Sequence, residues 1–195
     1  IATPTEAAGV GALGAVLLAI SKSSLTKKNL TEAVETTAEI TAMVFMILLG
    51  SSIFSLVFRG FGGDDLITGI FSELPGGAFG AVLVVMIIIF LLGFILDFIQ
   101  ITLVVVPIVG PALLMLGVDP IWLGIMIAIN LQTSFLTPPF GFALFYLRGV
   151  APDTLATKDI YRGVIPFILI QLGVLIALAI FPELVTALPQ AVYGS

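Results

Sequence analysis

A cluster of polar residues interrupts a long apolar segment between residues 130 and 141. Its first members are spaced at i, i+3, i+4 and i+7, which places their side chains on one face of a helix: Asn130, Thr133, Ser134 and Thr137. Amide and hydroxyl groups on one face can bind an ion or a small polar ligand, but in a membrane they also hold neighbouring helices together. The spacing alone therefore leaves both a binding face and a packing face open.

Pro138 and Pro139 follow this polar face and are predicted to break the helix. Because proline has no backbone N–H, the carbonyls of Ser134 and Phe135 lose their i+4 donors, and the residue before the pair is pushed away from α geometry. Gly141 allows the chain to enter a second helix over residues 142–147. Such an interrupted membrane helix offers carbonyl oxygens to a cation and a helix N-terminus to an anion, as in carriers. The alternative is a kinked structural helix, since prolines are common in membrane spans.

Asp97 is the only charged residue between residues 79 and 116. An ionised carboxylate at membrane depth costs about 3 kcal/mol or more, so Asp97 is expected to face a cavity, an ion or a partner group. The neighbouring residues Gly93, Gln100 and Thr102 are uncharged, which favours binding of Na⁺ or a proton over catalysis. The alternative is that Asp97 lies at the aqueous boundary and serves as the N-cap of the helix that follows.

The composition is that of an integral membrane protein. Of the 195 residues, 59% are hydrophobic and only 10% are charged, whereas soluble domains carry about 25% charged residues. The absence of Cys and His excludes disulfides, thiol nucleophiles, zinc sites and histidine catalysis, so no enzyme and no cofactor is expected. The net charge of −5 is spread over loops, which argues against a nucleic-acid partner. The chain begins with Ile, and we expect it to be part of a longer protein.

Hydropathy and charge divide the chain into five segments. Basic residues are enriched in cytoplasmic loops, and one arrangement places every Lys and Arg except Arg59 inside. Residues 79–117 are predicted to form a re-entrant hairpin that enters and leaves on the outer side, the alternative being two full spans with a tight turn. The predicted segments are 1–60 (a scaffold span, a cytoplasmic loop, an interfacial arm helix over residues 30–40 and a second span), 61–78 (a periplasmic loop), 79–117 (the hairpin), 118–149 (a discontinuous span) and 150–195 (a cytoplasmic loop, 149–163, and a last span, 164–184).

Five motifs occur in a characteristic order. They are Thr-Pro-Thr-Glu-Ala-Ala at 3–8, Gly-Phe-Ile-Leu-Asp at 93–97, Pro107 with Pro111, Gly-Val-Asp-Pro at 117–120, and Thr-Pro-Pro-Phe-Gly at 137–141. In this order and spacing they resemble the large membrane subunit, or M subunit, of tripartite ATP-independent periplasmic (TRAP) transporters. The resemblance covers nearly the whole chain and corresponds to the second, C-terminal half of that subunit.

This resemblance implies an all-α membrane protein that is one repeat of an elevator-type transporter, with a re-entrant hairpin and a discontinuous helix. It implies secondary active, Na⁺-coupled uptake of an organic acid, such as a dicarboxylate, in the inner membrane of a bacterium or archaeon. The implied partners are a small membrane subunit (Q type), a periplasmic substrate-binding protein (P type), the N-terminal half of the same subunit and membrane lipid. Na⁺ would be a coupling ion rather than a cofactor.

The resemblance also implies that the hairpin tip around Gly93 and Asp97 and the break at residues 137–139 form one half of the ion and substrate site. The polar residues described above complete the expected set. Those expected at the site are Gly93, Asp97, Gln100, Thr102, Asn130, Thr133, Ser134, Thr137, Pro138, Pro139 and Gly141, with Na⁺ at Gly93, Ser134 and Thr137. The first repeat is missing from the chain, so the other half of the site lies elsewhere. Two alternatives are a carrier like the divalent anion/Na⁺ symporters, which normally show Ser-Asn-Thr at their breaks, and a membrane scaffold that does not transport.

Overall fold

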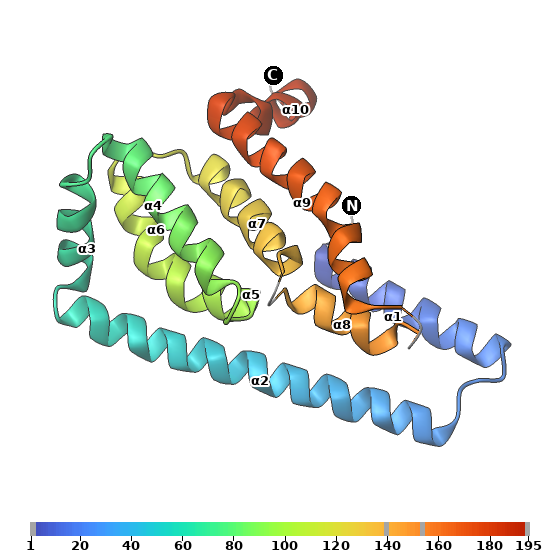
Figure 1. Cartoon of the computed structure of the whole chain (residues 1–195). Helices are drawn as coiled ribbons and strands as arrows, with labels where there is room; N and C mark the ends of the chain where they lie inside the picture. The colour runs from blue at the N-terminus through green and yellow to red at the C-terminus, as the bar shows by residue number, and fades with distance from the viewer. Residues whose placement is uncertain (1–2, 139–140, 153–154, 194–195) are drawn as a thin grey trace. The chain divides into compact units, whose positions relative to one another are not determined.

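The computed structural model describes residues 3–138, 141–152 and 155–193, and all regular secondary structure within these ranges is helical (Figure 1). The predicted all-α class is therefore confirmed. In chain order the helices are α1 (Pro4–Ser21), α2 (Lys27–Gly60), α3 (Gly63–Ser72), α4 (Gly77–Leu92), α5 (Phe98–Gln100), the π-helix η1 (Ile101–Val105), α6 (Val106–Met115), α7 (Pro120–Leu136), α8 (Phe142–Val150), α9 (Thr157–Ile180) and α10 (Glu183–Tyr193).

Several of these helices are long and apolar enough to cross a membrane, which takes about 20 residues. Within the described ranges they are α2, the continuous segment Phe98–Met115 and α9. Helices α3 and α4 meet at an angle of 116° and would count as a fourth span if they cross together. Helices α1 and α7 are apolar but shorter. The chain is thus an integral membrane protein, and the re-entrant path of residues 79–117 stays a prediction.

Residues 1–47 and 48–195 form two separate compact units. In the first unit, α1 starts with a capping box: the Thr3 N–H donates to a Glu6 carboxylate oxygen at 2.7 Å, and the Glu6 N–H donates to the Thr3 hydroxyl. Helix α2 runs without interruption for 34 residues, so the predicted arm helix and second span belong to one helix. The interfacial position of its first turns stays a prediction.

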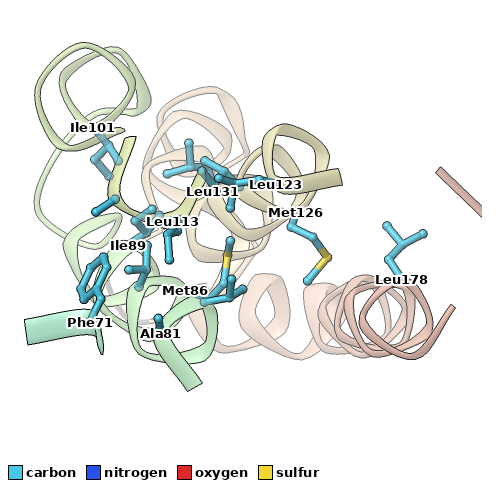
Figure 2. Packing of buried hydrophobic residues seen from close by; sticks show 14 residues of the cluster. Phe71, Ala81, Met86, Ile89, Ile101, Leu113, Leu123, Met126, Leu131 and Leu178 are labelled. Atoms are coloured by element: carbon cyan, nitrogen blue, oxygen red, sulfur yellow. The ribbon is translucent and has the colours of Figure 1, made fainter. Parts of the chain in front are cut away.

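The second unit has a core where α3, α4, α6 and α7 pack together. Ala81, Val85 and Ile89 recur every four residues along α4 and are at most 1% exposed, so one stripe of this helix is buried. In Figure 2, Ile89 lies beside Leu113 of α6 near the centre of the cluster. This core holds α4 and α7 side by side, which positions the ends of both helices.

The prediction that residues 61–78 form a loop was wrong, because they contain helix α3. Gly62 has a φ of 75° and turns the chain sharply after α2. Asp64 and Asp65 then occupy the first turn of α3, where carboxylates stabilise the positive end of a helix. Phe71 is only 5% exposed and belongs to the core cluster. The glycines mark the corners at the two ends of α3, and tertiary burial stabilises the helix between them.

The C-terminal part also differs from the prediction. Helix α9 begins at Thr157, so part of the predicted loop 149–163 is helical, and it ends at Ile180 instead of 184. A further helix, α10, follows and was not anticipated. Pro182 explains the boundary, since proline cannot continue the preceding helix. Helix α9 packs on α7, and the Trp122 indole N–H donates to the Leu178 carbonyl at 2.8 Å.

Gln171 on α9 has a buried side-chain oxygen that accepts no hydrogen bond from the described residues. A buried acceptor without a donor costs about 1–3 kcal/mol. Gln171→Leu is therefore expected to stabilise the permease by about 1–3 kcal/mol, which would be measured as a higher melting temperature of the purified protein in detergent. A lower melting temperature would show that this oxygen has a donor in the assembled protein.

Candidate functional site

The end of α4 touches the end of α7 through Gly93 and Ser134. Gly93 is the C-cap of α4 and has a helical φ of −64°, so its backbone conformation does not require glycine. Instead, a Cβ at Gly93 would overlap the Ser134 hydroxyl and lie 2.8 Å from the Ser134 Cβ. Both residues are buried. The structure thus places the first motif of the predicted hairpin directly against the polar face of α7.

Asn130 links the same two helices about one turn away from this contact. Its side chain is 4% exposed, and its Nδ2 donates to the Met86 carbonyl of α4 at 2.8 Å. A buried amide that bonds a backbone carbonyl of another helix stabilises packing in a membrane. Asn130, predicted at the site, is therefore observed in a role that positions α4 on α7.

The hydroxyl groups of the polar face all donate to carbonyls of their own helix. Thr133 and Ser134 are fully buried, while Thr137 is half-buried at the end of α7. Because each proton is used in this way, each hydroxyl oxygen faces its surroundings only as an acceptor. Acceptor oxygens suit a cation better than an anion. The Thr133 hydroxyl donates to the Ile129 carbonyl at 2.7 Å, and the Ser134 hydroxyl donates to the Leu131 carbonyl at 2.8 Å. The Thr137 hydroxyl donates to the Thr133 carbonyl at 2.7 Å.

Helix α7 ends at Leu136, two residues before Pro138. Thr137 is extended (φ −83°, ψ 120°), as expected for a residue before proline. The Ser134 carbonyl lacks its i+4 donor, as predicted, but it accepts the Thr137 N–H at 3.1 Å and is therefore satisfied. Pro138 lies in the turn after Thr137. Pro139 lies outside the described residues.

Gly141 closes the connection between α7 and α8. Its N–H donates to the Thr137 carbonyl at 3.1 Å, and the predicted second helix follows at once as α8. A Cβ at Gly141 would overlap the Phe135 carbonyl oxygen and lie 3.1 Å from its carbonyl carbon. The position is buried and leaves no space for a side chain. Gly141 therefore allows the first turn of α8 to lie against the last turn of α7.

Asp97 is the N-cap of α5, which was the alternative raised from the sequence. Its Oδ1 accepts the Phe98 N–H at 2.7 Å. The Gln100 side-chain oxygen in turn accepts the Asp97 N–H at 3.3 Å, which completes a capping box. Two residues predicted to bind the ion or substrate are thus engaged in starting the helical segment that continues through η1 and α6.

A cavity of about 700 Å³ lies between this helical segment and α7 with α8. Phe98 and Phe135 line it and form an edge-to-face pair with ring centroids 6.1 Å apart. Thr102, a predicted site residue, also lines it, whereas Gly93 and Ser134 do not. Gln132 lines the cavity but was not predicted, because it lies off the i, i+3, i+4, i+7 face. Its polarity within the motif was the signal that could have identified it.

Comparison with known proteins gives consistent matches over the chain. The family described as "Tripartite ATP-independent periplasmic transporter, DctM component" matches residues 1–184. The sialic acid TRAP transporter large permease protein SiaM of Vibrio cholerae is 28% identical over 98% of this chain and 45% of its own length. The ectoine/5-hydroxyectoine TRAP transporter large permease protein UehC of Ruegeria pomeroyi is 31% identical over 93% of this chain and 42% of its own.

A third relative is named for another class of substrate. The C4-dicarboxylate TRAP transporter large permease protein DctM of Pseudomonas aeruginosa is 30% identical over 96% of this chain and 44% of its own length. All three relatives are named as permeases and not as enzymes. The chain spans less than half the length of each.

Proposed function

Because this chain belongs to the DctM component family of tripartite ATP-independent periplasmic (TRAP) transporters, we propose that it is the C-terminal half of a large permease subunit that carries out Na⁺-coupled uptake of an organic acid. The family confirms the resemblance carried by the motifs. It also favours a TRAP permease over the divalent anion/Na⁺ symporter group. The contact between Gly93 and Ser134 is the observation that supports a site most directly.

The proposed Na⁺ site lies where the ends of α4 and α7 meet. Ser134 and Thr137 present hydroxyl oxygens as acceptors, and the Gly93 backbone lies against Ser134 without an intervening side chain. Hard cations are bound by such oxygen atoms. An ion at this position would hold the tip of the hairpin against the end of α7, so that the two parts move together. That coupling is what an elevator mechanism requires of the ion.

The substrate's carboxylate is proposed to bind at the N-terminus of α8. The first N–H groups of a helix carry a partial positive charge and attract anions. With α7 ending at Leu136 and α8 starting at Phe142, this positive end follows directly after the polar face. The two helices would then act as one discontinuous membrane helix, with a cation and an anion bound near its break. Residues 79–117 would supply the re-entrant hairpin.

The partners follow from the same proposal. The N-terminal half of the subunit would complete the site, a small membrane subunit would brace the scaffold, and a periplasmic binding protein would deliver the substrate to a permease in the inner membrane. A dicarboxylate is one candidate substrate, in line with the relative named for C4-dicarboxylates. Na⁺-dependent uptake by the complete complex would separate this function from that of a scaffold that does not transport.

Thr137→Val is expected to raise the Na⁺ concentration for half-maximal uptake about tenfold, because an oxygen ligand worth about 1.4 kcal/mol is lost. The measurement is uptake against Na⁺ concentration in proteoliposomes. Thr41→Val is a matched control, since the Thr41 hydroxyl also donates to the carbonyl four residues back at 2.7 Å but lies on α2. An unchanged half-saturation point in Thr137→Val would count against an ionic role for this residue.

A further inference from the structure

The π-helix η1 leaves one backbone carbonyl without its regular donors. The Val106 N–H donates to the Ile101 carbonyl, five residues back. It would otherwise serve the Thr102 carbonyl, whose next donor along the helix would be Pro107, which has no N–H. Short π segments within α-helices often occur at functional sites. In a membrane, a carbonyl freed in this way needs protein, water or a ligand as its partner.

Thr102 lies on the wall of the 700 Å³ cavity, which has the size of a small-molecule site. Gln132 lines the same cavity from α7, and both side chains are exposed to it. Among the described residues of the wall, none is charged and these two are the only ones with polar side chains. Ala143, the second residue of α8, also lines the cavity. The space therefore extends from η1 to the first turn of α8.

The residues of this wall suit the uncharged part of an organic acid better than its carboxylate. A carboxylate placed against apolar groups and carbonyl oxygens, with no cation beside it, would be strongly disfavoured. A hydroxyl group fits, because it can donate to an oxygen of Thr102, while the Gln132 amide both donates and accepts. The apolar surface that remains, including the Phe98–Phe135 pair, suits a carbon skeleton.

We infer that this cavity binds the uncharged, hydroxyl-bearing part of the substrate, and that Thr102 and Gln132 determine the selectivity for it. The inference rests on the proposed transport function, which places the carboxylate at the N-terminus of α8. Because the Thr102 and Gln132 side chains are exposed to the cavity, a substrate that lacks the matching hydroxyl loses a hydrogen bond there and binds less tightly than its hydroxylated counterpart.

The test compares a hydroxylated acid with its deoxy analogue in the complete complex. The full-length permease, with its small subunit and binding protein, is reconstituted and screened with two pairs of acids that differ by one hydroxyl group, malate with succinate and lactate with propionate. For the better hydroxylated substrate, Gln132→Leu is expected to raise KM about tenfold, which corresponds to one lost hydrogen bond. The KM of the deoxy analogue should change less than about threefold. The preference for the hydroxylated acid is therefore lost.

Gln171→Leu is the matched control, because it makes the same substitution on α9, outside the residues that line the cavity. It should leave both KM values unchanged. An equal loss for the two acids would show that Gln132 acts structurally, and a shift in Na⁺ half-saturation without a change in selectivity would assign the cavity to a cation. Either result overturns the inference. Uptake of unhydroxylated acids alone would overturn it while leaving the proposed function intact, and uptake of no acid would reject both.

Discussion

Gly93→Ala is expected to reduce uptake at least tenfold and to lower the melting temperature of the permease. The helical backbone at Gly93 accepts alanine, so the effect is steric. The new Cβ would overlap the Ser134 hydroxyl, which can rotate, and lie 2.8 Å from the Ser134 Cβ, which cannot. Inserting a methyl group into a packed interior costs about 1–3 kcal/mol. Helices α4 and α7 would have to separate at the proposed Na⁺ site.

A second substitution tests whether this contact is the cause. Ser134→Gly removes both colliding atoms, so Gly93→Ala should cost little stability in its presence, and the double-mutant cycle should show strong coupling. Uptake at saturating Na⁺ should recover, while Na⁺ affinity should stay low because the Ser134 hydroxyl is gone. Gly173→Ala on α9 is the control, since nothing lies within 4 Å of its Cβ. Additive effects of Gly93→Ala and Ser134→Gly would rule out the contact as the cause.

Gly141→Ala should have an effect of similar size at the other end of the site. Its Cβ would meet the Phe135 carbonyl, which is backbone and cannot rotate away as a side chain can. The turn would open, and the start of α8 would move away from α7. We expect at least a tenfold loss of uptake together with a lower melting temperature, measured on the same purified complex.

Gly149→Ala provides the comparison for this prediction. It lies in α8 and has nothing within 4 Å of its Cβ, so uptake and melting temperature should be those of the parent. Full uptake in Gly141→Ala would show that the close approach of α8 to α7 is not needed for transport. It would thereby remove the support for an anion site at the start of α8.

The features that could be predicted from the sequence are those that depend only on residues close together along the chain. Thr137 is extended and α7 stops because prolines lack an N–H and restrict the residue before them. The polar spacing placed Asn130, Thr133 and Ser134 on one face, and all three are buried. The membrane class follows from composition in the same direct way. These effects depend on covalent structure and helix periodicity, which need no knowledge of distant parts of the chain.

Other features depended on which distant segments meet. Residues 63–72 were expected in a loop because glycines and acids surround them, but burial of Phe71 in the core stabilises α3. Gln132 was overlooked because it lies off the main polar face. It becomes a candidate binding residue only because α7 and η1 lie on two sides of the same cavity.

Gly93 and Ser134 could each be recognised as motif residues, but their direct contact arises from the packing of α4 on α7. The Asn130–Met86 hydrogen bond that supports this packing joins residues 44 positions apart. Local preferences act over one or two helical turns, whereas the contacts that build this site are selected by the burial of whole helix faces against one another. For this reason the sequence determined the break after α7 and most of the helices and candidate residues, whereas only the tertiary structure decided that residues 63–72 are helical and which residues share a site.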